Sequence, residues 1–141
     1  MTPPDASGEQ AHFRALESLY ASAPINGLFE SRLEIVEAGL ARIHFEVQER
    51  HYHAAGAAHG TSYFKMLDDA AFYAGNSLVT DRFLLTTAFN LLLTRPLKAG
   101  PVVAEGRWIS GQRRVLTGTV TPNKMSKTIS VRIERTEMHR K

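Results

Sequence analysis

The sequence predicts an α+β fold in which a curved antiparallel sheet of about six strands wraps around one long central helix. Three observations support this fold class. Residues 60–78 form an apolar stretch with no proline and almost no polar face, which is typical of a buried helix. A hairpin pattern precedes this stretch. Four strand candidates with short breaks between them follow it.

The elements before the central helix are a tail, a short helix and a hairpin. Residues 1–8 are rich in Pro, Ser and Gly, and we expect a flexible N-terminal tail there. Apolar residues recur at helical spacing over residues 9–21 and Pro24 ends the pattern, so a short amphipathic N-terminal helix is expected. Residues 32–36 and 40–47 alternate around a turn at Gly39, which predicts a hairpin.

The strand candidates after the helix are residues 83–94, 102–110, 113–121 and 127–136, separated by breaks rich in Pro, Gly and Asn. We expect residues 9–141 to form a single domain. A sheet of this kind leaves edges to cover, and pairing of two copies edge to edge is one solution.

Composition narrows the function classes. The chain of 141 residues has no cysteine, which excludes disulfides, thiolate metal sites and cysteine catalysis. No secretory pattern opens the sequence, and no apolar run is long enough for a bilayer, so a cytoplasmic protein without membrane contact is expected. Residues 1–94 carry 6 basic and 11 acidic side chains, whereas residues 95–141 carry 11 and 3. The basic side chains of residues 95–141 either lie on solvated faces of strands or bind an anionic ligand. The sequence contains no motif that indicates nucleic-acid binding.

The stretch from His53 to Gly60 carries the candidate chemistry. Gly60 stands where the helix should begin, so its N–H lacks an intrahelical partner and favours negative charge, such as a developing oxyanion. Gly56 and the alanines around it would allow a substrate to approach the backbone closely. Glycines that only shape the loop are the alternative explanation.

Asp68 and Asp69 interrupt the apolar helix. Adjacent helical residues point about 100° apart, so the two carboxylates cannot share one face. Asp68 has Phe64 and Phe72 four residues to either side, which indicates an apolar setting, whereas Asp69 has Lys65 as a possible partner. A carboxylate in an apolar setting is typical of a general base or a nucleophile. An acidic patch that faces solvent or a partner is the alternative.

Three histidines flank the glycine loop, and they form a weak zinc pattern at positions 51, 53 and 59. We expect no metal and no cofactor. Ser62 and Ser77 lack the surrounding sequence of a hydrolase nucleophile.

Together these residues resemble a known family. The pattern His53, Gly56, His59, Gly60, Thr61 and Asp68 is similar to that of the hotdog-fold acyl-CoA thioesterases, in the PaaI-type branch related to phenylacetate metabolism. The resemblance covers residues 31–136, and it implies a helix wrapped by an antiparallel sheet.

The resemblance also implies roles for individual residues. Asp68 would be the base or nucleophile, the Gly60 N–H would polarise the thioester carbonyl, and His59 would help to position it. Thr86, or its neighbour Thr87, would assist the attacking water. The active site would lie at the interface of a homodimer, and two dimers commonly form a tetramer. Coenzyme A belongs to the substrate, and its phosphates would meet basic residues such as Arg95, Lys98, Arg113, Arg114, Lys124 and Lys127.

Two departures from the family pattern stand out. Relatives usually have asparagine where this chain has His53, and a second glycine where it has Thr61. Because a histidine donates or accepts hydrogen bonds according to its tautomer and charge, the resemblance does not define the efficiency or the pH dependence of the reaction. Asp69 has no assigned role. Two alternatives therefore remain: a non-catalytic module that binds acyl-CoA, and a hydroxyacyl-thioester dehydratase. The absence of proline from the histidine loop counts against the dehydratase.

Overall fold

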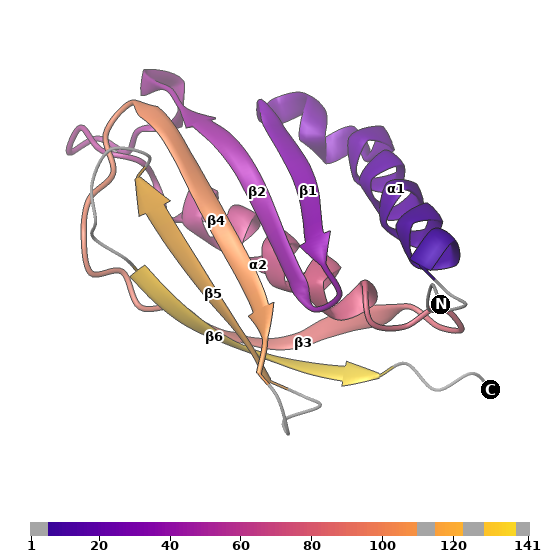
Figure 1. Ribbon diagram of the computed structural model, residues 1–141. Coiled ribbons are helices and arrows are strands. Elements are labelled where there is room, and N and C mark those ends of the chain that lie inside the picture. Colours follow the sequence, from indigo (N-terminus) through magenta and orange to yellow (C-terminus); the bar gives the residue numbers. More distant parts are fainter. Residues whose placement is uncertain (1–5, 110–114, 123–128, 138–141) are drawn as a thin grey trace.

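The computed structural model describes residues 6–109, 115–122 and 129–137, with side chains described up to residue 109 (Figure 1). The described residues form two helices and six strands, together with two short 3₁₀ turns. They are α1 (Ala6–Ser22), η1 (Pro24–Leu28), β1 (Ser31–Glu37), β2 (Leu40–Val47), η2 (Glu49–His51), α2 (Gly60–Asn76), β3 (Leu84–Asn90), β4 (Gly100–Trp108), β5 (Val115–Pro122) and β6 (Ile129–Glu137).

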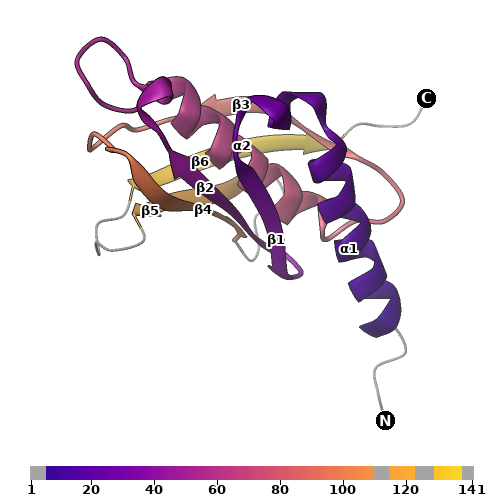
Figure 2. The same ribbon diagram turned by 90° about the horizontal axis from the view of Figure 1, so that it is seen from above.

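The six strands form one antiparallel sheet in the order β1-β2-β4-β5-β6-β3. The sheet curves around α2, which crosses its inner face (Figures 1 and 2). This arrangement confirms the predicted α+β fold, with its antiparallel sheet wrapped around a central helix. The edge strands are β1 and β3, and α1 lies beside β1 (Figure 1).

Small residues bring α2 close to the sheet. Ala70, Ala71 and Ala74 on α2 are fully buried and face the sheet. Opposite them, a Cβ placed on Gly106 of β4 would lie 2.3 Å from the carbonyl carbon and oxygen of Ala70. Glycine at this position therefore sets the distance between the helix and the sheet.

The N-terminal helix starts earlier than the sequence predicted. Residues 6–8, which were assigned to a flexible tail, form the first turn of α1. Phe13, Leu16 and Tyr20 bury one face of α1 in the core, as the helical spacing indicates. The hairpin of β1 and β2 also forms as predicted, and Gly39 occupies its turn with a φ of +82° that favours glycine.

The strand predicted over residues 83–94 is too long. β3 ends at Asn90, and the chain then crosses the start of α2 to reach β4 on the other side of the sheet. The apolar residues Leu92 and Leu93 extended the strand pattern, but both are more than half exposed in this crossing segment. The prediction of a helix buried on all sides is also only partly correct, because Phe64 on α2 is 47% exposed.

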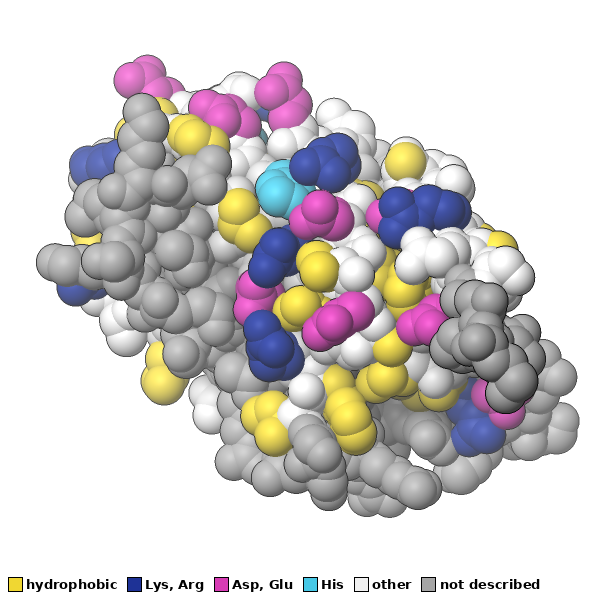
Figure 3. Space-filling view, viewed as in Figure 1, with side chains coloured by type: hydrophobic (Ala, Val, Ile, Leu, Met, Phe, Trp, Pro, Cys, Tyr) yellow, Lys and Arg dark blue, Asp and Glu magenta, His cyan; other side chains and the backbone are white. Residues whose placement is uncertain are grey.

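Over β1, β2 and β4 the outer face of the sheet carries charged side chains of both signs, with apolar side chains among them (Figure 3). On β1, β2 and β4 these charges are paired: Arg42 bonds Glu105 at 3.0 Å, and His44 bonds Glu34 at 3.2 Å. Burial alone would raise the pKa of Glu105, but hydrogen bonds from Arg42 and Arg107 lower it overall. None of the described helices is long and apolar enough to span a membrane.

Candidate active site

The glycine loop is a closed hairpin that leads directly into α2. Backbone bonds from His59 N–H to the His51 carbonyl and from His53 N–H to the Ala57 carbonyl, both 2.9 Å long, hold its two arms together. Gly56 turns the tip with a φ of +83°, which explains why a glycine is found there. The hairpin thereby fixes where the first residue of α2 begins.

His59 caps α2 and leaves the first helical N–H open. Its Nδ1 accepts a 3.1 Å hydrogen bond from the Thr61 backbone N–H and lies 3.1 Å from the Thr61 hydroxyl. The cap therefore satisfies the second helical residue. Helix geometry leaves the Gly60 N–H without an intrahelical partner, and the helix dipole makes it a donor suited to an oxyanion.

Asp68 is bonded to β3. The Thr86 hydroxyl donates a 2.6 Å hydrogen bond to Asp68 Oδ1, so the structure brings the threonine that the sequence named first to the carboxylate. Thr87, its neighbour, is exposed.

Aromatic pairs lie on both sides of this hydrogen bond. Phe64 packs on Phe89 with ring centroids 4.6 Å apart, and Phe72 packs on Phe83 at 5.3 Å. One face of α2 thus meets β3 and Phe83, the residue just before it, in three successive pairs, with the carboxylate in the middle. The apolar setting that the sequence predicted for Asp68 is present.

The Asp69 carboxylate contacts Lys65 rather than β3. Lys65 donates a 2.5 Å bond to its carboxylate and a 2.6 Å bond to the Asn26 side chain. The Lys65 ammonium also lies 5.3 Å from the ring centre of Tyr20. Burial, aided by the Asp69 charge, raises the pKa of Tyr73 to about 12. Asp69 therefore belongs to an ion pair within α2, as its spacing from Lys65 suggested, and Lys65 links that pair to Asn26 of η1.

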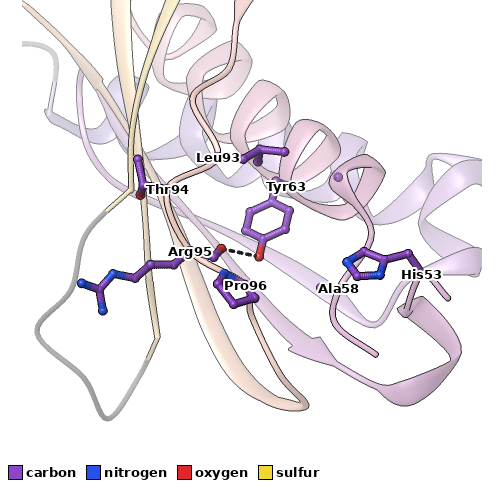
Figure 4. Close-up of a pocket in the computed structure, with 8 residues that line it drawn as sticks. His53, Ala58, Tyr63, Leu93, Thr94, Arg95 and Pro96 are labelled. Atoms are coloured by element: carbon purple, nitrogen blue, oxygen red, sulfur yellow. Dashed lines mark hydrogen bonds between the residues drawn. The ribbon is translucent and has the colours of Figure 1, made fainter. Parts of the chain in front are cut away.

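A cleft of about 290 Å³ opens beside the start of α2 (Figure 4). Its lining includes His53, Gly60 and Arg95. The Tyr63 hydroxyl fixes the far wall, because it donates to the Arg95 carbonyl at 3.0 Å and accepts from the Leu97 N–H at 2.7 Å. The Arg95 guanidinium points to the side of the cleft opposite His53 (Figure 4).

The structure groups the predicted residues into two clusters. His53 and Gly60 line the cleft. Asp68 lies further along α2, where Thr86 of β3 bonds its carboxylate. Lys98 donates a hydrogen bond to the Gly56 carbonyl at the hairpin tip. The candidates Arg113, Arg114, Lys124 and Lys127 have side chains outside the described residues.

The zinc pattern of the three histidines is not matched by their placement. Among the described side chains, no three His, Asp or Glu residues are positioned to share a metal ion. His51 is packed against Phe29 and Phe45, whereas His53 is exposed and its Nδ1 accepts a 3.0 Å bond from the Ala55 N–H.

One supporting residue was missed from the sequence. Asn76 ends α2 and is 1% exposed, and its amide oxygen accepts a 2.8 Å bond from the Leu84 N–H. Its amide nitrogen donates to the carbonyls of Phe72 and Leu84. These bonds tie the start of β3 to the end of α2 and so set the position of Thr86. A polar residue at the end of an apolar helix was the available signal.

Comparisons with known proteins bear on the family and the fold of the chain. Residues 55–121 match the family model described as the thioesterase superfamily. A search of curated proteins gave no match.

Solved structures with the same fold include the PaaI protein of the Escherichia coli phenylacetic acid degradation operon, at 17% identity, with 93% of this chain and 96% of that chain covered and a TM-score of 0.81. A thioesterase family protein from Silicibacter pomeroyi has 17% identity, with 92% and 96% covered and a TM-score of 0.77. A phenylacetic acid degradation-related protein from Ralstonia eutropha JMP134 has 20% identity, with 90% and 99% covered and a TM-score of 0.74.

The family match over residues 55–121 agrees with the predicted resemblance to the thioesterase superfamily and with the class of thioester hydrolase, and the solved structures confirm the predicted fold. The PaaI protein and the Ralstonia protein share the fold of this chain.

Proposed function

We propose that this protein hydrolyses an acyl-CoA thioester to the free acid and CoA, with Asp68 as base or nucleophile. The hydrogen bond between Thr86 and Asp68, held between two aromatic pairs, is the observation that carries the proposal. A bonded carboxylate on a largely apolar helix is suited to act on a water molecule or on a carbonyl carbon.

We further propose that each active site is shared between two copies of the chain. Gly60 and Asp68 lie eight residues apart on one helix, which corresponds to about 12 Å along its axis. A carbonyl oxygen within hydrogen-bond reach of Gly60 is therefore too far from Asp68 of the same chain. A homodimer in which Gly60 of one copy faces Asp68 of the other removes this difficulty.

The β3 edge is the proposed dimer contact. β3 ends the sheet opposite the edge that α1 accompanies, and within the described residues no strand pairs with its outer side. Exposed apolar side chains lie on and around it: Phe64, Phe83, Leu85, Leu92 and Leu93. Pairing through this edge would cover that surface and bring the two α2 helices together. Such a dimer can pair again into a tetramer.

The proposed reaction follows from these positions. Asp68 either accepts a proton from a water molecule that attacks the thioester carbon, or attacks that carbon itself to form an anhydride that water then hydrolyses. The Gly60 N–H of the other copy stabilises the oxyanion. Collapse of the tetrahedral intermediate breaks the carbon–sulfur bond and releases CoA as the thiolate, which is then protonated. Thr86 holds the carboxylate in place and can orient the water.

Basic residues near the cleft are the proposed partners of the CoA phosphates. Arg95 lines the cleft, and Lys98 lies at the hairpin tip, where its ammonium bonds Gly56. Arg113, Arg114 and Lys124 remain candidates from the sequence.

A panel of aryl, short-chain and medium-chain acyl-CoA thioesters tests the proposal, with Asp68→Asn as the control variant. We expect hydrolysis of at least one member, and a loss of about 100-fold or more in kcat for the variant. Tight binding of acyl-CoA without turnover would instead indicate a binding module. Full activity of Asp68→Asn would show that this mechanism is wrong.

A further inference from the structure

The imidazole of His51 is enclosed by aromatic side chains at the base of the glycine hairpin. Its ring lies nearly parallel to Phe29, with centroids 5.8 Å apart and an interplanar angle of 18°, and 5.1 Å from Phe45. Nε2 is buried, and no acceptor among the described protein groups lies within hydrogen-bond distance of it. A charged ring would therefore find no carboxylate bonded to it there.

The hydrogen bonds of His51 define which ring nitrogen carries the proton. Nδ1 accepts a 2.9 Å bond from the Gln48 backbone N–H, the first residue of a reciprocal cap around η2. Because an N–H donor faces Nδ1, the proton of the neutral ring belongs on Nε2. Protonation of Nδ1 would place two donors against each other and break the cap.

The same residue holds the hairpin that leads to Gly60. The His51 carbonyl accepts the His59 N–H at 2.9 Å, and Tyr52 forms a β-bridge with Ala58 directly beyond. His59 is the N-cap of α2 and directly precedes Gly60. The position of His51 therefore affects the position of the Gly60 N–H through the hydrogen bond between the His51 carbonyl and the His59 N–H.

We propose that His51 is a positioning residue that works only as the neutral Nε2–H tautomer, and that its protonation releases the hairpin of residues 52–58 and displaces the Gly60 donor. Two charged groups act on the imidazole in opposite directions. Arg50, its chain neighbour, opposes a charge on His51, whereas Glu30, which lies 4.0 Å from Arg50, favours one. Lys65 lies 5.2 Å from the ring of Phe29, on which His51 packs.

The direction of the pH dependence follows. Burial, with a smaller contribution from Arg50, lowers the pKa of His51, and Glu30 offsets this only in part. The unfolded or released hairpin binds a proton more readily than the closed one. The stabilising contribution of His51 is therefore fully present above its unfolded pKa of about 6.5, and it is lost as the pH falls through the lowered pKa of the closed state.

The test uses the full chain and needs no substrate. Nitrogen NMR of the imidazoles reports the tautomer and titration of His51, and hydrogen exchange reports the protection of the His59 amide between about pH 7.5 and 5. His51→Asn is the key variant, because its Oδ1 can accept from Gln48 in place of Nδ1 but does not titrate. His44→Asn, on the outer face of β2, is the matched control.

We expect the Nε2–H tautomer at neutral pH and a measurable loss of His59 protection on acidification, because the released hairpin binds the proton more readily than the closed one. His44→Asn should show the same loss, and His51→Asn should not. A proton on Nδ1 at neutral pH overturns the inference, as does an unchanged pH profile in His51→Asn. If His51→Asn does not fold, the tautomer and titration in the unmodified chain decide.

An activity measurement extends this test and rests on the proposed function. The acidic limb of the kcat profile should flatten in His51→Asn. If no thioester is hydrolysed while the tautomer and the amide protection behave as expected, the proposed function fails and the role of His51 in the hairpin stands.

Discussion

Thr86 on β3 donates a 2.6 Å hydrogen bond to the carboxylate of Asp68 on α2, between one aromatic pair toward the start of the helix and another toward its end. The bond occupies one oxygen of the carboxylate and fixes the plane of the group. It links an edge strand to the central helix at the point where the proposed chemistry takes place.

Removing this hydroxyl should lower kcat without unfolding the protein. Thr86→Val keeps the shape of the side chain but loses the donor, and a hydrogen bond to a charged group is worth about 1.5–3 kcal/mol, or about 10- to 100-fold in rate. Thr86→Ser should recover most of the activity. Steady-state kinetics on the best thioester will measure the effect, and a larger loss in Thr87→Val would point to the neighbouring threonine instead.

The Gly60 N–H can be removed without breaking the helix. Proline is tolerated at the first helical position, and His59 already has the extended conformation, φ −66° and ψ 146°, that precedes a proline. Gly60→Pro should therefore fold but lose about 100- to 1,000-fold in kcat, as expected for one oxyanion donor. Gly60→Ala keeps the N–H, and its Cβ would meet Leu93 at an ordinary 3.6 Å, so it is the matched control. Equal losses in both variants would exclude this role for the N–H.

Gly106 should tolerate no side chain. In Gly106→Ala the new Cβ would lie 2.3 Å from backbone atoms of Ala70, so the helix must move away from the sheet. We expect a loss of about 3 kcal/mol or more in the free energy of unfolding, at the upper end for an overpacked core. Gly27→Ala, with no atom within 4 Å of the added Cβ, should change it little. Denaturant unfolding of both variants will decide, and similar midpoints would show that the close approach is relieved at little cost.

Asn76 should matter for both stability and activity. Asn76→Ala leaves the Leu84 N–H and carbonyl without their partners at a buried site, which should cost about 2–4 kcal/mol. Because β3 starts there, kcat should also fall through misplacement of Thr86. Thermal unfolding and kinetics on the same sample will measure both effects. Normal activity with reduced stability would confine Asn76 to a structural role.

The sequence predicted the parts of this molecule that depend on local pattern. Hydrophobic periodicity located α1, α2 and the β1–β2 hairpin, because burial of one face imposes that period. The helix arithmetic also separated Asp68 from Asp69 and named Lys65 as a possible partner of Asp69, which the structure confirms, whereas the contact of Asp68 with Thr86 on β3 is a finding of the structure. In contrast, β3 was predicted too long, because the apolar residues Leu92 and Leu93 continue its pattern past the point where the chain must cross to β4.

Contacts between segments that are distant in the sequence could not be predicted from sequence patterns. Thr86 was the predicted helper and Thr87 its alternative, because the sequence does not define the register of β3 against α2, which places the Thr86 hydroxyl on Asp68. His51 looked like one of three loop histidines until packing placed it between Phe29 and Phe45. The role of Asn76 likewise depends on where β3 begins.

The shared active site makes a prediction that a site within one chain does not. Gly60→Pro and Asp68→Asn should each be nearly inactive alone, because every site in either dimer lacks one of the two groups. When the two variants are unfolded together and refolded as a mixture, half of the dimers should be heterodimers. Each heterodimer would contain one site with an intact Gly60 from one copy and an intact Asp68 from the other, so activity should recover to about a quarter of the unmodified level. If both groups act within one chain, every chain in the mixture stays defective and the activity does not rise above that of the separate variants. Size-exclusion chromatography of the mixture will confirm that dimers have re-formed.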